Sequence, residues 1–259
     1  MNKKSQQPSK KQQKEKSSIR DNVEMILEVL VYVFFINAFL LQTFGIPTSS
    51  MEDNMLIGDH LLVDKIAYSR SLGTLDGFMF PQLDMKRGLT VVFKSPPEVK
   101  RNNMSRLMYV KRVIALPGET IMVKENQVYI NSNPLHEPYV SFKGNPSVPD
   151  NFPPENLSDW WPEFPLEHRY NLVETELGMA YQVPEDHYFC MGDNRNISAD
   201  SRVWGPLHQD YLIGKPWRNY WSFDAPTEHY LNKNLFQRIG YTIINFFKHT
   251  RWERTLKKY

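Results

Sequence analysis

The sequence predicts a mainly β protein, an antiparallel β-sheet domain preceded by one N-terminal transmembrane helix. A long apolar stretch lies near the N-terminus, and many short β-rich runs separated by turn signals follow it, a pattern typical of antiparallel β folds. The 259 residues suffice for a short anchor and one domain with a sizeable core. The net charge of +2 gives no general indication of a nucleic-acid partner.

The N-terminal region divides into a basic tail, residues 1–22, and a predicted transmembrane anchor, residues 23–46. The tail carries seven basic residues against two acidic ones. Its other residues are mostly Gln, Ser, Asn and Pro, so we expect it to be disordered. Residues 25–46 contain one acidic residue, Glu28. As a helix with a rise of about 1.5 Å per residue they would span roughly 30 Å, the thickness of the hydrocarbon core.

Two alternatives to an uncleaved span are a cleavable signal peptide and a buried helix of a soluble domain. The apolar region of a signal peptide is usually about 7–15 residues long and ends in a small-x-small site, which residues 43–47 match poorly. We therefore favour the uncleaved span. Because basic residues concentrate before it, the positive-inside rule places the N-terminus in the cytoplasm and the chain after Pro47 outside.

The chain after Pro47 is expected to form a catalytic β core in two parts, residues 47–130 and 185–225, interrupted by an elaboration, residues 131–184. The elaboration contains the pair Trp160-Trp161. We interpret its aromatic residues as packing residues, with a substrate-facing surface as the alternative. The β-rich runs bounded by turn signals are residues 56–57, 61–63, 90–93, 108–114, 120–123, 127–130 and 188–191.

The C-terminal segment, residues 226–259, is basic and amphipathic, and it is too interrupted for a second span. Residues 235–259 fit an amphipathic helix on an anionic membrane surface. They fit equally a helix packed on the domain. The sequence leaves both interpretations open.

The cysteine and histidine content excludes several kinds of site. The single cysteine, Cys190, cannot form an intramolecular disulfide or a zinc site built on cysteine pairs. We interpret it as a small buried hydrophobic residue rather than a catalytic thiol. His136-Glu137 begins like a zinc-protease motif, but Val140 stands where the second histidine belongs. We therefore predict no metal and no cofactor.

A hydroxyl cluster, Thr48-Ser49-Ser50, follows Pro47 where the anchor ends. On local chemistry alone it is a polar turn at a helix exit. Lys111, in a β-rich run, is on the same grounds an ordinary exposed strand lysine. The serine-hydrolase signatures Gly-x-Ser-x-Gly and Ser-x-x-Lys are absent.

Four stretches, in this order after the apolar anchor, match the pattern of one enzyme family. They are PTSSM (47–51) with GD (58–59), RG (87–88) before VVF (91–93), YVKRVIALPG (109–118), and MGDNR (191–195) with SADSR (198–202) and WG (204–205). Together they resemble the bacterial type I signal peptidases, the leader peptidases of the Ser/Lys class. Thr48, Ser49, Leu89 and Asn196-Ile197 depart from the family pattern without removing a catalytic group.

The resemblance implies a Ser/Lys catalytic pair on a β domain of signal-peptidase type. Ser50 would be the nucleophile and Lys111 its general base, with Ser198 positioning the Lys111 amine. The Thr48 hydroxyl and the Ser50 backbone N–H would bind the oxyanion. Lysine, with an ordinary pKa near 10.4, acts as a base only when burial lowers that pKa. The implied structural ion pairs are Asp200 with Arg202 and Asp193 with Arg112.

By the same resemblance, the substrate is the signal peptide of an exported preprotein, cut after a small-x-small sequence. It would add as a β-strand against residues 43–50 and 108–111. Membrane lipid would be the other partner, and no nucleic acid is expected. The implied substrate-binding residues are Phe44, Ile46, Val110 and Tyr109, with shallow pockets that admit alanine.

Three other functions share some of these features. A catalytically inactive, membrane-anchored envelope binding protein would not need Ser50, Lys111 and Ser198 together. A self-cleaving Ser/Lys transcriptional repressor needs a DNA-binding domain, which the N-terminus lacks. A specialised processing peptidase for pili or conjugation differs only in substrate. Our prediction is a single-pass serine endopeptidase that removes signal peptides at the outer face of a bacterial cytoplasmic membrane.

Overall fold

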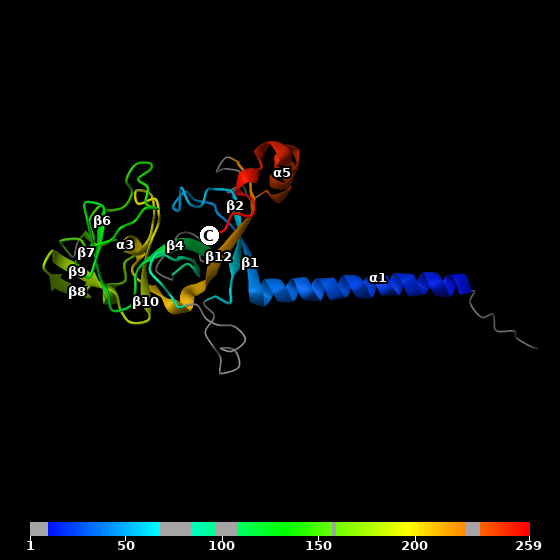
Figure 1. Cartoon of the computed structure of the whole chain (residues 1–259), viewed down its shortest axis with the longest axis horizontal. Coiled ribbons are helices and arrows are strands. Elements are labelled where there is room, and N and C mark those ends of the chain that lie inside the picture. The colour runs from blue at the N-terminus through cyan, green and yellow to red at the C-terminus, as the bar shows by residue number, and fades with distance from the viewer. Residues whose placement is uncertain (1–9, 68–83, 97–107, 157–158, 226–233) are drawn as a thin grey trace, which may run out of the picture. The chain divides into compact units, whose positions relative to one another are not determined.

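The computed structural model describes residues 10–67, 84–96, 108–156, 159–225 and 234–259, without the side chains of residues 10–18 and 38. It divides into two compact units, Met1–Gln42 and Thr43–Tyr259, which are described separately (Figure 1). The start of the predicted basic tail, residues 1–9, and residues 226–233 of the predicted C-terminal segment lie outside the described residues.

The N-terminal unit is helical, with α1 (Lys10–Phe35) continuing as a π-helical turn, η1 (Ile36–Leu40). From residue 23 onward, the large apolar side chains of α1 are exposed on every side of the helix. Among the described residues, no helix combines the length and the sustained apolar character of a membrane span.

The helix ends earlier than the predicted anchor, which extends to residue 46. Residues Leu41–Gly45, near the end of the predicted anchor, instead form strand β1. The physical reason is local: Thr43 and Phe44 favour an extended backbone, and Pro47 cannot continue a helix.

The second unit is built on two antiparallel sheets, which confirms the predicted antiparallel β architecture (Figure 1). One sheet has the strand order β1-β2-β12-β3-β4-β10-β11, and the other has the order β7-β6-β5-β9-β8. The strands are β2 (Asp59–Asp64), β3 (Thr90–Lys94), β4 (Met108–Ala115), β5 (Thr120–Lys124), β6 (Gln127–Ile130), β7 (Asn133–Pro134), β8 (Leu172–Thr175), β9 (Gly178–Gln182), β10 (His187–Met191), β11 (Leu207–His208) and β12 (Leu212–Ser222). The short helices are η3 (Leu166–His168), α3 (Ser201–Trp204), η4 (Gln209–Tyr211) and η5 (Trp252–Arg254), and the longer C-terminal helix is α5 (Leu235–His249).

Three clusters of buried apolar side chains form the core. The cluster beneath the five-stranded sheet is rich in aromatic residues and includes Phe152, Trp160 and Tyr181, so Trp160 packs rather than faces a substrate. A second cluster contains Cys190, which is fully buried, and burial raises the pKa of its thiol. The third cluster contains Val110 and surrounds the loop that carries Ser50.

Sequence analysis missed the longest strand, β12, and the β8–β9 hairpin inside the predicted elaboration. Gly214 and Pro216 interrupt the sequence pattern of β12 and count against a strand. In the structure a Cβ at residue 214 would lie 2.1 Å from the Asp64 carbonyl oxygen, so this glycine permits a close approach of two backbones at a register irregularity. The predicted strand at residues 56–57 is wrong, because these residues belong to the turn that precedes Gly58-Asp59.

The C-terminal segment is held to the domain by the buried carboxylate of Asp59. Arg254 donates to it at 2.6 Å, Ser222 at 2.7 Å and the Tyr259 hydroxyl at 3.1 Å. Asp59 also accepts from the Leu56 amide at 2.9 Å. The end of the chain is thereby bound to the turn that closes the Ser50 loop.

Candidate active site

The structure brings the Lys111 amine and the Ser50 hydroxyl into contact. Ser50 follows Ile46 and Pro47 in the loop between β1 and β2, whereas Lys111 lies in the middle of β4. Nζ of Lys111 donates a hydrogen bond of 2.6 Å to Oγ of Ser50. A hydroxyl and an amine at this distance have the geometry of a nucleophile and its base.

Burial changes the chemistry of Lys111. Its side chain is only 2% exposed, because β4 is paired with β3 on one side and the Ser50 loop covers the amine. Burial lowers the pKa of Lys111 to about 8, and the nearby carboxylates of Asp200 and Asp193 only partly oppose this effect. About a tenth of the amine is therefore uncharged at pH 7 and about half at pH 8.

The Ser50 loop is fixed by backbone contacts and by two buried methionines. Met51 and Met55 are each 1% exposed and anchor the loop in the third apolar cluster. The Asn194 amide donates to the Ser50 carbonyl at 3.1 Å. Ile46 and the Gly58 turn exchange backbone hydrogen bonds, so both ends of the loop are closed on each other. The Ser50 side chain is thus held by a preformed frame.

Two hydrogen-bond donors face the region around Ser50 Oγ. Thr48 Oγ1 lies 3.4 Å from Ser50 Oγ, and Thr48 is exposed. Among the residues that the structure describes, the Ser50 backbone N–H has no hydrogen-bond partner. Both donors are therefore available to a group that binds beside Ser50.

Ser198 lies directly behind the Ser50 backbone. A Cβ added at Gly192 would lie 2.1 Å from Ser198 Oγ and 2.6 Å from the Ser50 carbonyl oxygen, so only glycine allows this close packing. Ser198 Oγ is buried and makes no hydrogen bond within the described part of the chain. Ser198, which the resemblance implies positions the Lys111 amine, thus makes no hydrogen bond to that amine here.

The turn that carries Ser198 is held by Asp200 and Arg202. The Asp200 carboxylate accepts two hydrogen bonds of 2.9 Å from the Arg202 guanidinium and one of 3.1 Å from the Gly192 amide. Both charged side chains are almost completely buried. Burial alone would raise the pKa of Asp200, but the charge and hydrogen bonds of Arg202 outweigh it and hold that pKa below its usual value. The carboxylate therefore stays ionised.

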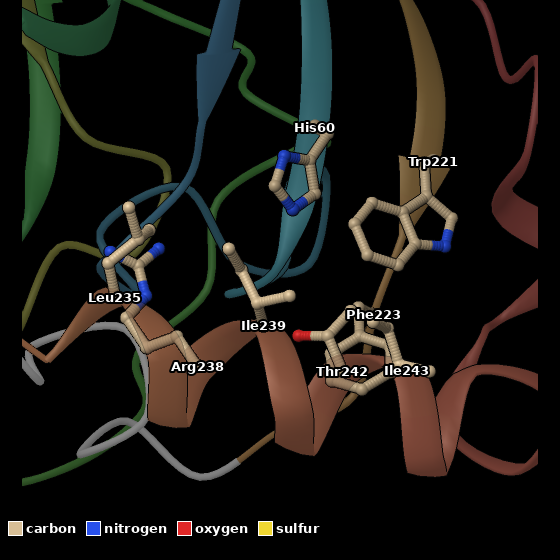
Figure 2. A pocket seen from close by; sticks show the side chains of 8 residues that line it. All are labelled: His60, Trp221, Phe223, Leu235, Arg238, Ile239, Thr242 and Ile243. Atoms are coloured by element: carbon tan, nitrogen blue, oxygen red, sulfur yellow. The ribbon is translucent and has the colours of Figure 1, made fainter.

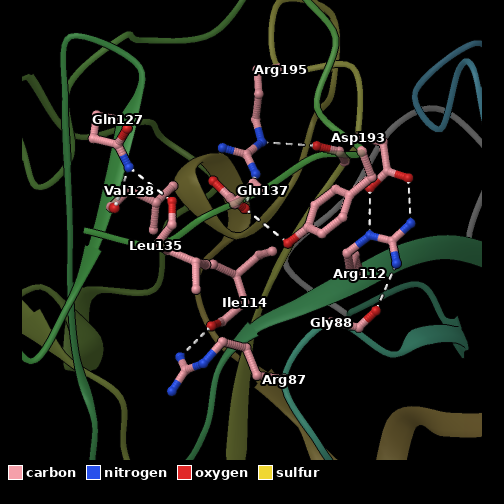
Figure 3. A network of polar contacts seen from close by, with 12 residues as sticks. Arg87, Gly88, Arg112, Ile114, Gln127, Val128, Leu135, Glu137, Asp193 and Arg195 are labelled. Atoms are coloured by element: carbon pink, nitrogen blue, oxygen red, sulfur yellow. Dashed lines mark hydrogen bonds and ion pairs between the residues drawn. The ribbon is translucent and has the colours of Figure 1, made fainter. Parts of the chain in front are cut away.

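A second buried ion pair joins β4 to the loop after β10. Arg112 Nε donates to Asp193 at 2.7 Å and its Nη2 donates at 2.6 Å, a bidentate geometry. The same guanidinium donates to the Gly88 carbonyl at 2.6 Å and lies 4.0 Å from the centre of the Tyr139 ring (Figure 3). Because Arg112 follows Lys111 directly, this network sets the position of β4 at the site.

The four candidate substrate-binding residues do not lie together. Ile46 and Val110 are buried in the third cluster, with Phe44 partly buried against it. Tyr109 packs in the second cluster and stacks on Phe93 with ring centres 6.0 Å apart. The reason is the strand period: adjacent residues of β4 point to opposite faces, so Tyr109 and Val110 do not line the same pocket.

No group of three or more histidine, cysteine, aspartate or glutamate side chains within the described ranges is arranged to hold a metal ion. A family model described as signal peptidase, peptidase S26, matches residues 19–221. This chain belongs to the S26 signal peptidase family.

Individual relatives of this signal peptidase agree with the assignment. Signal peptidase I of Pseudomonas aeruginosa is 31% identical over 223 residues, covering 82% of this chain and 75% of the relative. Signal peptidase I of Leptolyngbya laminosa is 31% identical over 216 residues, covering 83% and 86% respectively. A solved signal peptidase I from Enterococcus faecalis V583 aligns at 28% identity with 51% of this chain and 96% of its own, with a TM-score of 0.35. The enzyme is a serine endopeptidase of the signal peptidase I type.

Sequence analysis missed several residues that support the site of this signal peptidase. Tyr139 covers Arg112, Glu137 forms an ion pair with Arg195 (Figure 3), and the Ser141 hydroxyl donates to the Glu52 carbonyl at 2.8 Å. Three of them, Glu137, Tyr139 and Ser141, belong to the predicted elaboration, where no periodic pattern or motif marked them. Only their contacts reveal that residues 137–141 brace the Ser50 loop.

Proposed function

We propose that this peptidase removes signal peptides from exported preproteins, with Ser50 as nucleophile and uncharged Lys111 as general base. The observation that carries the proposal is the 2.6 Å contact between Lys111 Nζ and Ser50 Oγ inside a buried environment that lowers the lysine pKa to about 8. With the amine neutral, the direction of this hydrogen bond reverses and the Ser50 hydroxyl donates to Nζ.

In the first step, Ser50 Oγ forms a bond to the carbonyl carbon of the scissile peptide while its proton passes to Lys111 Nζ. The carbonyl π electrons move to oxygen, and this oxyanion accepts hydrogen bonds from the Ser50 N–H and the Thr48 hydroxyl. The C–N bond then breaks, and Lys111 returns the proton to the leaving amine. Water, deprotonated by the same lysine, attacks the acyl-enzyme and releases Ser50.

Ser198 and the two ion pairs would act through position. Ser198 Oγ is buried without a partner among the described residues, so its hydroxyl is available to hydrogen-bond the Lys111 amine. Asp200 and Arg202 hold the Ser198 turn, and Asp193 with Arg112 holds β4. They contribute to catalysis by fixing the geometry of the Ser50 and Lys111 side chains.

The substrate is proposed to bind as an added β-strand. β10 pairs with β4 only over Arg112–Ala115, whereas β3 pairs with β4 on the other side over Met108–Arg112. One edge of residues 108–111 is therefore without a strand partner in the described part of the chain, directly beside Lys111. Extended peptides bind such edges through backbone hydrogen bonds. Ile46 and Val110 lie close enough to limit the peptide's side chains to small ones.

The proposed topology is a single span with the N-terminus inside. The exposed apolar side chains along α1 and the basic residues before them support an uncleaved anchor. Ser50 lies four residues beyond the end of the predicted anchor at residue 46, so it would act at the outer surface of the cytoplasmic membrane, where signal peptides emerge.

The test is cleavage of a purified preprotein with an Ala-x-Ala site by full-length enzyme in liposomes. We expect the wild type to cut after the second alanine, with Ser50→Ala and Lys111→Ala folded and at least about 10⁴-fold slower. Lys111→Arg is the matched control, because its side chain stays charged and cannot accept a proton. Near-normal activity of Lys111→Ala contradicts the proposed base. Inertness of the wild type on several such preproteins favours a specialised processing peptidase.

A further inference from the structure

Helix α5 presents its most apolar side chains to solvent rather than to the domain. Phe236 is 87% exposed, Ile243 70%, Ile244 83% and Phe247 82%. These residues recur at the spacing of one helix face. A helix that serves only to cover a domain turns such a face inward, so this orientation needs another explanation.

The opposite face of α5 contacts the domain through aromatic side chains. Phe246 contacts Trp221 with ring centres 5.9 Å apart, and Tyr241 and His249 contact Phe223. Asn245 is half-buried on the same side. An apolar cleft of about 190 Å³ remains between the helix and the sheet, lined in part by His60 of β2 and by Ile239 (Figure 2). The contacts of α5 therefore leave Phe236, Ile244 and Phe247 facing away from the domain, whereas Ile243 also lines the cleft.

The surroundings of this stripe are basic and aromatic. Residues 235–259 contain six lysine and arginine residues and one acidic residue, Glu253. Lys248 and Lys258 are exposed. Trp252, 53% exposed, stacks on Phe247 with ring centres 6.4 Å apart. Apolar side chains flanked by basic residues and tryptophan are the composition of helices that lie in the headgroup region of an anionic bilayer.

The location of α5 within the second unit agrees with such a contact. A Cβ added at Gly45 would lie 3.6 Å from the His60 ring, and the same ring lines the cleft beneath α5. Gly45 ends β1, two residues after the unit begins at Thr43. The end of β1 and the cleft beneath α5 therefore share the His60 ring.

We propose that α5 and the Trp252 turn form a membrane contact of this peptidase, lying in the outer headgroup layer of an anionic bilayer with Phe236, Ile243, Ile244 and Phe247 inserted. The contact rests on the proposed topology, because it needs the domain at the membrane surface. It lies beyond residue 221, where the match to the family model ends. A lipid surface rather than a second copy is favoured, since two copies of a segment with an excess of five positive charges would repel each other.

The test measures the depth of single nitroxide labels on the full-length protein, one copy per lipid nanodisc. Labels are attached at Ile244→Cys and Phe247→Cys, with Tyr170→Cys as the matched control, because Tyr170 is 73% exposed and lies just before β8 in the five-stranded sheet. Native Cys190 is fully buried and does not compete for the label. Collisions with oxygen report lipid, and collisions with a water-soluble nickel chelate report solvent.

With anionic lipid, we expect residues 244 and 247 to collide more with oxygen than with nickel, and residue 170 to show the reverse. Lys248→Glu/Lys258→Glu is expected to move both labels toward water. Labels as accessible to nickel as residue 170 overturn the proposal. Labels shielded from both reagents also overturn it, because protein then covers the helix.

Cleavage assays distinguish the proposed membrane contact of α5 from the proposed Ser/Lys peptidase function. Ile244→Gln/Phe247→Gln is expected to slow cleavage of a membrane-inserted preprotein several-fold in nanodiscs, with cleavage of a soluble peptide in detergent unchanged. Equal loss in both assays overturns the membrane contact and indicates a structural defect.

If Ser50→Ala is inactive but the labels at 244 and 247 are water-exposed on an anchored protein, the membrane contact fails and the Ser/Lys function stands. Release of the protein by alkaline extraction overturns both the topology and the contact.

Discussion

Lys111 Nζ and Ser50 Oγ lie 2.6 Å apart although 61 positions separate the two residues in the chain. The contact is made by a buried amine whose pKa is lowered to about 8 by desolvation. In the proposed mechanism only the uncharged amine is active, so the protonation state of one lysine controls both the rate and the stability of the domain.

The rate should follow the titration of Lys111. Below pH 8 the amine is charged and cannot accept the Ser50 proton, so we expect kcat/KM to rise tenfold per pH unit and to level off above about pH 8. The measurement is kcat/KM for a soluble peptide between pH 5.5 and pH 10, together with thermal unfolding across the same range. A profile that is flat through pH 8 while the protein stays folded contradicts Lys111 as the base.

Removing the buried amine should stabilise the protein while abolishing activity. In Lys111→Met the apolar site no longer holds a charge, and with a pKa of about 8 when folded and 10.5 when unfolded the gain at pH 7 is about 3 kcal/mol. The wild type regains this stability as pH rises from 8 to 10.5, because the unfolded chain then binds more protons than the folded one. Thermal unfolding of both proteins at pH 7 and pH 10 tests this. An equal difference at the two pH values contradicts the lowered pKa.

The close packing at Gly192 should not tolerate a side chain. In Gly192→Ala the new Cβ would overlap Ser198 Oγ and the Ser50 carbonyl, and a displacement of about 1 Å at the nucleophile costs on the order of 10² in rate. Gly240→Ala is the control, because a Cβ there meets nothing within 4 Å and should stabilise α5 by about 1 kcal/mol. The measurement is kcat/KM beside thermal unfolding. Wild-type activity of Gly192→Ala contradicts the steric argument.

The Asp59 carboxylate should stabilise the folded domain at neutral pH and lose this effect in acid. Burial tends to raise the pKa of Asp59, but hydrogen bonds from Arg254, Ser222 and the Leu56 amide outweigh it and lower that pKa below 3.8. We expect Asp59→Asn to cost about 3 kcal/mol at pH 7, since Arg254 loses its partner. The difference from wild type should shrink only as pH falls below about 4, where the carboxylate of the unfolded chain becomes protonated. Denaturant titrations at pH 7 and pH 3.5 measure it, and a difference that grows with acid would refute the assignment.

Substitutions at Ile46 and at Tyr109 should have different effects. The first should change substrate specificity, and the second should change stability. Ile46→Ala enlarges the pocket next to Val110, and we expect about tenfold faster cleavage of preproteins whose small residues are replaced by leucine. Tyr109→Ala should leave this preference unchanged and cost about 2 kcal/mol of stability, because Tyr109 packs on Phe93. Cleavage of paired alanine and leucine substrates tests both. An altered preference in Tyr109→Ala would place that side chain in the substrate pocket.

Part of the fold was predictable from the sequence because it depends on the local pattern of residues. The hairpin formed by β5 and β6, and strand β4, follow from β-rich runs beside Gly118 and Lys124-Glu125-Asn126. The resemblance then selected Ser50, Lys111 and Ser198 from two loops and one strand that local chemistry alone did not distinguish. Strand β12 was missed because Gly214 and Pro216 interrupt its pattern, and the β8–β9 hairpin was missed because exposed residues at a sheet edge conceal the period of a strand.

The sequence by itself determined the antiparallel β class, the basic tail before an apolar stretch, and the identities of the hydroxyl and amine groups in the site. Only the tertiary structure decided that Lys111 is buried against Ser50, that Tyr109 faces away from Val110, and that α5 turns its apolar stripe outward. The physical reason is that a pKa, a shared pocket and an exposed face each depend on which distant residues exclude water from a group, and short-range periodicity carries no information about those contacts.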